Sequence, residues 1–305
     1  MRRVYAIGET VLDIIFKDGV VQDSKPGGSM LNTAVSLGRA GLHVSLITEF
    51  AKDQVGMHVR SFLEHNGVDC QYVYLFDQGK TSLALAFLDD QNDASYVFYK
   101  NYADRRLQFQ LPDFDPQDIL LFGSFFGIDP AIRRQVMKLV ARAKEAGCLI
   151  IYDPNFRKPH AHQLNSLLPI IRENMAIADM VRGSHEDFQI IFQANSIQQV
   201  RKALGNQPEA LVMTQSSSAV YVDAPGVQDV FPVKKILPLS TIGAGDNFNA
   251  GLIFGLIREG VTRQTLSVID QQKWERMIGH GIDFASDVCM SYENYISESF
   301  VKSLK

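Results

Sequence analysis

Short, uniformly apolar runs alternate along this chain with longer segments in which apolar side chains recur every three or four residues. Runs of this length are typical of strands in a parallel sheet, because such strands are covered on both faces. The alternation predicts an α/β protein that is built from β-α-β units around a mostly parallel sheet. The predicted strands are Val4–Ile7, Val44–Thr48, Ile119–Phe122, Cys148–Tyr152, Met180–Val181 and Leu211–Thr214.

The segments between these runs carry the start and stop signals of helices. Ser29 can accept a hydrogen bond from the first turn of a helix that reaches Gly38–Gly41, so it is the predicted N-cap. Glycine ends or follows other helical segments, as is common where the last residue is left-handed. The remaining predicted helices are Met57–Asn66, Ala131–Ala146, Gly245–Glu259 and Gln271–Cys289.

Two stretches break this rhythm and predict antiparallel strands. Residues 11–22 alternate between apolar and polar, with a turn at Asp18-Gly19. Leu83–Leu88 and Tyr96–Tyr99 are apolar runs joined by a polar segment, which is a hairpin pattern. We interpret about 11–24 and 72–101 as a small sheet that stands off the main one as a lid. Residues 1–305 are predicted to form a single domain with this lid.

The composition excludes several classes of protein. The chain has 305 residues and a net charge of −4, and its basic residues are too scattered to form a nucleic-acid-binding surface. Its three cysteines form no C-x-x-C pair, which is typical of a reducing compartment. The longest apolar run, Ile119–Ile128, is about half of what a membrane span requires. We therefore expect a cytoplasmic protein without nucleic-acid or membrane partners.

The strongest chemical signal is Gly243-Ala244-Gly245-Asp246, directly at the start of a predicted helix. A glycine turn at a helix N-terminus presents backbone N–H groups to an anion. A carboxylate beside it can accept the proton of a hydroxyl that attacks a phosphate. The same residues can also be a simple loop with an acidic first turn. The chain has no G-x-x-x-x-G-K-[ST] loop, and Phe248 stands where a dinucleotide fingerprint requires glycine.

Two further motifs place polar side chains at the ends of predicted elements. Gly27-Gly28 leads into a helix with Asn32 on its first turn, and Asp13 follows the first strand, so both side chains could bind the hydroxyls of a polyol. Asp153–Arg157 follows an apolar strand, where residues face the ligand crevice of open α/β sheets and an arginine can clamp a phosphate or a sugar oxygen. Each motif can equally be a turn with solvated side chains.

In this order and at these intervals, the three motifs resemble those of the ribokinase/PfkB carbohydrate kinase family, over nearly the whole chain. Gly27–Asn32 and Gly243–Asp246 look like its two signatures, and Asp153–Arg157 is similar to its central D-x-N-x-R element. Tyr96–Arg105, which contains Ala103-Asp104, looks most like the fructokinase branch. The resemblance implies a three-layer α/β/α sandwich with a β lid, through which two copies often form a homodimer.

The resemblance also implies a role for each matching position. Asp246 would be the catalytic base, and Arg157 would contact the sugar or the transferring phosphate. The anion hole would consist of Gly243, Ala244 and Gly245. The residues expected to contact the sugar are Asp13, Gly27, Gly28, Asn32, Phe98, Lys100 and Asn155. Those expected at the ATP are Ser184, Asp187, Thr214, Ser216, Thr241, Gly243, Gly245 and Asn249, with Mg²⁺ held through water by Asp187 or Glu186.

Three positions depart from the family pattern. Ser240 stands where relatives have an aspartate that helps to hold a monovalent cation, which leaves open whether K⁺ activates the protein. Thr214–Ala219 lacks both glycines of the usual T-x-G-x-x-G. Asp187 keeps the carboxylate of the usual N-x-x-E motif on a side chain that is one methylene shorter.

The expected reaction is ATP-dependent phosphorylation of a ketose, with D-fructose at its 6-hydroxyl as the leading candidate. A 2-keto-3-deoxygluconate kinase or a ribokinase-type activity is the alternative within the family, because Lys100 and Arg157 also suit an acidic sugar. A catalytically silent, kinase-like binding protein is the alternative from another class, motivated by Ser240 and Ser216. Retention of Asp246 argues against silence, since a silent relative has little reason to keep the base.

Overall fold

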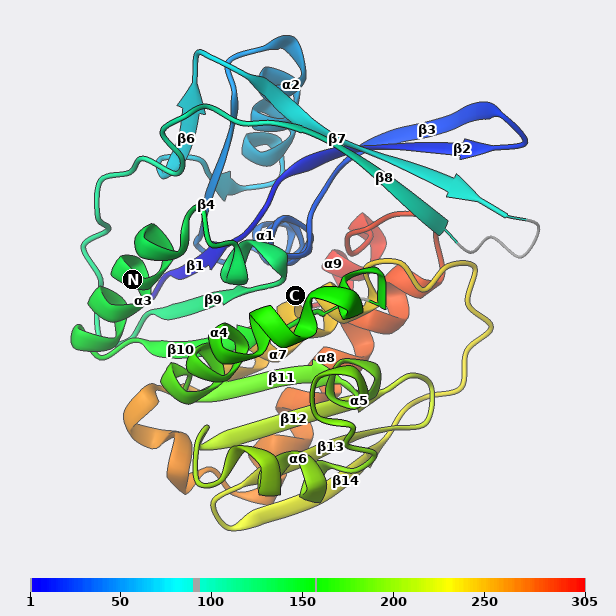
Figure 1. The fold of residues 1–305 in the computed structure, drawn as a ribbon. Helices are drawn as coiled ribbons and strands as arrows, with labels where there is room; N and C mark the ends of the chain where they lie inside the picture. The colour runs from blue at the N-terminus through cyan, green and yellow to red at the C-terminus, as the bar shows by residue number, and fades with distance from the viewer. Residues whose placement is uncertain (1, 90–93, 157, 305) are drawn as a thin grey trace.

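The computed structural model describes residues 2–89, 94–156 and 158–304 of the chain. Within them, a ten-stranded sheet crosses the centre of the molecule (Figure 1). Its strands are β1 (Val4–Ile7), β4 (Val44–Ala51), β5 (Val68–Asp69), β6 (Val73–Phe76), β9 (Ile119–Gly123), β10 (Leu149–Asp153), β11 (Met180–Ser184), β12 (Ala210–Gln215), β13 (Ala219–Ala224) and β14 (Val227–Pro232). Their order is β14-β13-β12-β11-β10-β9-β1-β4-β5, and β6 pairs with β4.

Most neighbouring strands in this sheet run parallel. β1 pairs with β4 and β9, and the series continues in parallel from β9 through β10 and β11 to β12. At one edge, β12, β13 and β14 pair antiparallel. The predicted mostly parallel sheet is therefore confirmed, and each predicted strand is present within a few residues of its expected bounds.

Helices cover both faces of the sheet and give the molecule three layers (Figure 1). They are α1 (Ser29–Arg39), α2 (Gln54–His65), α3 (Arg133–Glu145), α4 (Leu164–Ile177), α5 (His185–Phe192), α6 (Ile197–Leu204), α7 (Ala244–Arg258), α8 (Gln271–Cys289) and α9 (Glu298–Ser303), with 3₁₀ helices η1 (Phe125–Ile128), η2 (Lys158–Gln163) and η3 (Arg263–Val268). Helices α3 to α6 share one core with the sheet, and α1, α2, α7 and α8 share the other. In the described part of the chain, no helix has the length and apolar character needed to cross a membrane.

Strand β1 is apolar at every position because its two faces pack into the two cores of the three-layer fold. Val4 and Ala6 pack into the core that includes α1, α7 and α8, whereas Tyr5 and Ile7 pack into the core on the other face. All four side chains are fully buried. A strand that is covered on both faces requires an apolar side chain at every position, and not at every second one.

A separate four-stranded sheet stands off the main body as the lid (Figure 1). Its strands are β2 (Val11–Lys17), β3 (Val20–Gly27), β7 (Lys80–Leu88) and β8 (Ala94–Asn101), in the order β3-β2-β7-β8. The predicted turn at Asp18 and Gly19 joins β2 to β3, and both residues have positive φ, as this hairpin turn requires. Most of the segment predicted to join the other two strands, residues 90–93, lies outside the described residues.

The predicted start of the second lid segment at residue 72 is wrong. Val73–Phe76 forms β6, which pairs in parallel with β4 of the main body. Val73 and Leu75 pack against the main core, and Phe76 is buried. The lid segment begins at Lys80, because the apolar side chains of β6 before it are buried against the main body.

Candidate active site

The N-terminal turns of α1 and α7 meet, and this brings two of the predicted motifs together. Asp246, in the first turn of α7, accepts hydrogen bonds from Ser29 Oγ (2.6 Å) and Asn32 Nδ2 (2.8 Å). Thr33 Oγ1 donates to the backbone carbonyl of Asp246 (2.8 Å). The Asp246 side chain is buried, and each of its carboxylate oxygens has a donor on α1 that fixes its direction.

The start of α1 differs from the prediction at Ser29. Gly28 is the N-cap, with φ 127°, and Ser29 is the first helical residue. The Ser29 hydroxyl does not cap the helix because it donates to Asp246. A Cβ at residue 28 would lie 2.1 Å from the carbonyl oxygen of Glu9, so both the positive φ and the close approach require glycine.

Asp13 on β2 lies directly against Gly27, where a Cβ would be 2.0 Å from Asp13 Oδ2. Burial raises the pKa of Asp13 to about 7, the ammonium of Lys25 opposes this shift, and the carboxylate of Asp246 adds to it. The two carboxylates are therefore close enough to influence each other. The geometry places Asp13, Gly27 and Asn32 around the predicted base.

The lid contributes Lys100, whose Nζ lies 2.6 Å from Glu9 Oε1 and 5.1 Å from the centre of the Phe98 ring. The Tyr102 hydroxyl also donates a hydrogen bond to Glu9 Oε1. The positive charge of Lys100 is thus balanced by Glu9, which the sequence motifs do not single out. The position of Glu9, directly after β1 and Gly8, could have identified it as a candidate site residue, because residues past the carboxyl ends of parallel strands face the ligand crevice.

The glycine turn before α7 opens onto a cavity of about 520 Å³. Gly243 is the N-cap of α7 with φ 76°, and the first backbone N–H groups of a helix have no acceptor within the helix. Together with the helix dipole, such groups favour an anion. The predicted residues that line this cavity are Asn155, Ser184, Glu186, Asp187, Thr214, Ser216, Thr241, Gly243, Ala244 and Gly245.

Arg182, at the centre of β11, forms part of the cavity wall next to the turn. Its Nη1 donates to Asp153 Oδ2 (3.0 Å) and its Nη2 to Thr214 Oγ1 (2.9 Å). A Cβ at Gly245 would lie 3.1 Å from Arg182 Nη1, so the guanidinium packs directly against the turn. Arg182 is 5% exposed. A buried arginine beside the glycine turn is a candidate functional group that no motif predicted, although a charge inside an apolar strand is a signal for it.

Asn249 does not lie where the sequence predicts it. It is 1% exposed and is absent from the described cavity lining, so it cannot contact a nucleotide there directly. Its Nδ2 donates to Asp153 Oδ2 (2.6 Å), the same oxygen that accepts from Arg182. Asn249 therefore supports the wall from beneath, because the helical turn between it and Asp246 carries its side chain toward the sheet.

The residues proposed to hold Mg²⁺ lie at the cavity, but their carboxylates already have partners. Asp187 closes a capping box with Ser184 and accepts a hydrogen bond from the backbone N–H of Phe156 (2.6 Å). Burial raises the pKa of Asp187. Glu186 Oε1 lies 3.3 Å from Lys158 Nζ. Within residues 2–89, 94–156 and 158–304, no group of three or more His, Cys, Asp or Glu side chains could hold a metal ion by itself. The predicted Arg157 lies outside the described residues.

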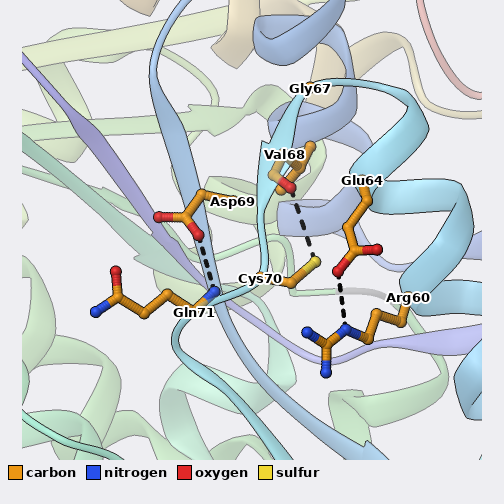
Figure 2. Close-up of a pocket in the computed structure, with 7 residues that line it drawn as sticks. All are labelled: Arg60, Glu64, Gly67, Val68, Asp69, Cys70 and Gln71. Carbon is orange, nitrogen blue, oxygen red and sulfur yellow. Dashed lines mark hydrogen bonds and ion pairs between the residues drawn. The ribbon is translucent and has the colours of Figure 1, made fainter.

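A second pocket, shown in Figure 2, lies beside β5 and the end of α2. Its polar groups are already paired, since Arg60 Nε lies 2.8 Å from Glu64 Oε1 and Gln71 N donates to Asp69 Oδ1 (2.9 Å). The Cys70 thiol is buried, and desolvation raises its pKa to about 12. This pocket contains none of the predicted site residues, so the chemistry belongs to the cavity at α7.

A three-layer α/β/α sandwich with a lid sheet, and a carboxylate directly after a glycine turn at a helix N-terminus, fit a kinase that acts on a small molecule. The pfkB family carbohydrate kinase model matches residues 1–286, and the chain belongs to this family. It is a carbohydrate kinase.

Curated relatives and solved structures agree with this assignment. The chain is 26% identical over 282 residues to a fructokinase of Vibrio alginolyticus, covering 92% of each chain. It is 28% identical over 264 residues to a fructokinase of Klebsiella pneumoniae, covering 85% of this chain and 86% of the relative. A fructokinase double mutant from Vibrio cholerae O395, in a form with bound fructose, ADP and potassium ion, has a TM-score of 0.84 at 22% identity and covers 100% of this chain and 98% of its own. Aminoimidazole riboside kinase from Salmonella enterica has a TM-score of 0.82 at 19% identity, with 99% of both chains covered. These structures show the shared fold.

Proposed function

We propose that this carbohydrate kinase transfers the γ-phosphate of ATP to the 6-hydroxyl of D-fructose, with Asp246 as the catalytic base. The observation that carries the proposal is the placement of the Asp246 carboxylate. Ser29 and Asn32 hold it at the N-terminus of α7, beside the glycine turn that opens onto the cavity. A hydroxyl between this carboxylate and the turn can lose its proton while the turn holds the phosphate that it attacks.

In the proposed step, the sugar oxygen forms a bond to the γ-phosphorus while the bond from phosphorus to the bridging oxygen of ADP breaks. The hydroxyl proton passes to Asp246, and ADP leaves with the bonding electron pair. The first amides of α7 and the Arg182 guanidinium stabilise the negative charge on the transferring group. Phosphoryl transfer depends mainly on positioning and charge stabilisation, which suits a carboxylate whose direction is fixed by two hydrogen bonds.

Magnesium is part of the proposal as the ion that neutralises the charge of the ATP phosphates. Glu186 and Asp187 both line the cavity. Because Asp187 already accepts hydrogen bonds from Phe156 N and Ser184 N, it fits an ion that is held through water better than one bound directly. Glu186 can take part once it turns away from Lys158. Glu186 and Asp187 are consecutive residues in the first turn of α5.

The charges at the lid favour a neutral sugar. Lys100 is a lid cation, and Glu9 Oε1 lies 2.6 Å from its Nζ. An acidic sugar such as 2-keto-3-deoxygluconate would gain little from Lys100, because Glu9 already balances its charge. The names of the relatives from Vibrio alginolyticus and Klebsiella pneumoniae support fructose. A ribokinase-type or riboside kinase activity is the alternative, supported by the fold shared with aminoimidazole riboside kinase.

An assay of ADP release with Mg²⁺ tests the proposed substrate. The panel contains fructose, 2-keto-3-deoxygluconate, ribose and aminoimidazole riboside, and we expect kcat/KM to be about tenfold or more higher for fructose than for the others. Faster turnover of the keto acid or of a riboside would replace fructose as the substrate. No ADP release above background with any of them would support a silent binding protein in place of a kinase.

We also propose that the lid pairs with the lid of a second copy. The lid exposes large apolar side chains on β7 and β8, including Phe87, Val97 and Tyr99. An exposed apolar strand at a sheet edge is a common site of association, because unpaired backbone groups and side chains can both be covered there.

We propose that the protein works in the cytoplasm. Its free, buried cysteines at 70, 148 and 289 are consistent with a reducing compartment.

A further inference from the structure

The loop that follows α8, residues 290–296, packs against the glycine turn of the site. Asn247 Nδ2 donates to the carbonyl oxygen of Asn294 (2.8 Å). A Cβ at Gly243 would lie 3.2 Å from that same oxygen, so loop and turn are in contact. The position of the turn that faces the phosphate therefore depends on what holds this loop.

A free monovalent cation does not fit the residues around this loop. The Vibrio cholerae fructokinase structure is a potassium-bound form, and the family resemblance assigns a cation-holding aspartate to the position of Ser240. Here the Ser240 hydroxyl replaces a charged group, and it accepts a hydrogen bond from Ile242 N (3.2 Å). The carbonyl oxygen of Cys289, the last residue of α8 before the loop, accepts a hydrogen bond from Leu239 N (2.8 Å). Oxygens that already accept hydrogen bonds from fixed donors are poor ligands for a soluble ion.

Two side-chain cations hold the loop instead. Lys25 Nζ donates to the carbonyl oxygen of Tyr292 (2.7 Å), and Arg39 Nη1 donates to that of Ile296 (2.8 Å). Lys25 is 6% exposed and also forms an ion pair with Asp23 (2.9 Å). A lysine is rarely buried to this extent unless its charge is used, and here it is used on a main-chain carbonyl.

We propose that Lys25 takes the part of the soluble monovalent cation, so that phosphate transfer by this protein does not require potassium. An ammonium group that binds carbonyl oxygens orients their dipoles as a bare cation does, and a charged donor makes the hydrogen bond stronger than a neutral one. Lys25 is a positioning residue that acts on the glycine turn through residues 290–296. The activity readout rests on the proposed function, whereas the unfolding readout does not.

The first test compares the full chain in potassium chloride and in tetramethylammonium chloride at equal ionic strength. We expect kcat for fructose to change by less than about twofold and Tm by less than about 1 °C, because a protein that binds no ion gains no stability from it. Stimulation of kcat by about tenfold, or a rise in Tm with potassium concentration, would overturn the inference. If no sugar is turned over in either salt, the proposed function fails, and the Tm comparison still decides the inference.

The second test removes the ammonium group. Lys25→Ala leaves the carbonyl of Tyr292 without its donor, so we expect kcat to fall by about tenfold or more and amide hydrogen exchange of residues 290–296 to become faster. Potassium or methylammonium should restore part of the lost kcat. Lys52→Ala, which removes an exposed lysine paired with Asp77 (2.9 Å), is the matched control and should change neither quantity. Unchanged kcat and unchanged exchange in Lys25→Ala would overturn the role of Lys25.

Discussion

At the scale of single residues, Asp246 and Asp13 show how one site gives two carboxylates different properties. Asp246 receives hydrogen bonds from Ser29 and Asn32, which fix the direction of both its oxygens. Asp13 lies against Gly27, and desolvation raises its pKa to about 7. Near neutral pH, Asp13 is therefore divided between its acid and its carboxylate, and the carboxylate is the form that accepts hydrogen bonds from two sugar hydroxyls.

Asp13 should make sugar binding depend on pH. Because its pKa is about 7, we expect KM for fructose to fall as the pH rises from about 6 to 8. The Asp13→Asn variant should have a higher KM that is flat over this range. Steady-state kinetics at fixed ionic strength measure both, and a flat KM in the unmodified protein would contradict the assignment.

The same shift predicts a pH dependence of stability. The folded protein holds the Asp13 proton more tightly than the unfolded chain, whose aspartate has a pKa near 3.8. This contribution to stability is present at low pH, is lost as the pH rises through about 4 to 7, and stays constant above that range. Thermal unfolding of Asp13→Asn should show a smaller loss of stability across this interval than the unmodified protein.

Arg182 is expected to contribute to catalysis through its charge at the anion turn. Arg182→Met should lower kcat by about 10²–10³-fold, the usual loss for a group that stabilises transition-state charge, and Arg182→Lys should retain part of the activity. Arg142→Met removes an exposed arginine paired with Glu145 and is the control. Circular dichroism checks that each variant is folded. Full activity in a folded Arg182→Met variant would show that Arg182 only supports the strand.

Contacts between side chains that lie far apart in the sequence are the part of the site that the sequence could not predict. The motif positions placed Asp246 and Asn32 in one site. Ser29 was wrongly predicted to cap α1, because its hydroxyl can bond either to the local backbone or to a distant carboxylate, and it donates to Asp246. Arg182 was missed because its partners, Asp153 and Thr214, lie on neighbouring strands. Such contacts follow from strand order, which short-range patterns do not contain.

At the scale of elements, α7 and α8 pack so closely that their glycines are needed. A Cβ at Gly251 would lie 2.2 Å from the carbonyl oxygen of His280, and one at Gly281 would lie 2.8 Å from the Phe248 ring. α7 begins with the glycine turn and Asp246, so the contact between the two helices sets where the base stands.

A pair of glycine substitutions tests this packing. Gly251→Ala should lower the free energy of unfolding by about 1–3 kcal/mol, because the new methyl group overlaps the backbone of α8. Gly279→Ala, on the same helix pair, meets nothing within 4 Å and should raise that free energy by about 0.5–1 kcal/mol. Urea denaturation measures both. Equal effects of the two substitutions would contradict the close contact.

Elements with a strong local pattern were predicted well, and those defined by a distant partner were not. Gln271–Cys289 was predicted with the bounds that the structure shows, because a long periodic segment follows the capping residue Asp270. β6 was assigned to the lid, although it pairs with β4. Alternation along a short strand shows which side chains are buried but not which sheet buries them.

At the scale of the whole molecule, the runs of apolar residues predicted the parallel sheet, and the alternating and hairpin patterns predicted the lid sheet. The family resemblance implied the three layers. Asp13 and Lys100, which are proposed to contact the sugar, are lid residues, whereas the proposed base Asp246 belongs to the body. The proposed site therefore combines residues from two parts of the protein that only the tertiary structure brings together. Pairing between two lids would keep both in place.

A charge on the outer lid should separate the proposed dimer. We expect light scattering to give twice the chain mass of 34.1 kDa for the unmodified protein and a shift toward the monomer for Tyr99→Glu, because Tyr99 is 58% exposed on β8. Val268→Glu, at a position that is 76% exposed and far from the lid in sequence, is the control and should remain dimeric. An unmodified protein that stays monomeric at high concentration would contradict the proposal.

The Asp246→Asn variant tests most directly whether Asp246 is the catalytic base. The substitution keeps the size of the side chain and removes its charge. We therefore expect kcat for ADP release with fructose to fall by about 10²–10⁴-fold, the usual contribution of a general base, while calorimetric Kd values for sugar and nucleotide stay within a few-fold. A variant that binds both ligands and turns over at the unmodified rate would show that Asp246 is not the base.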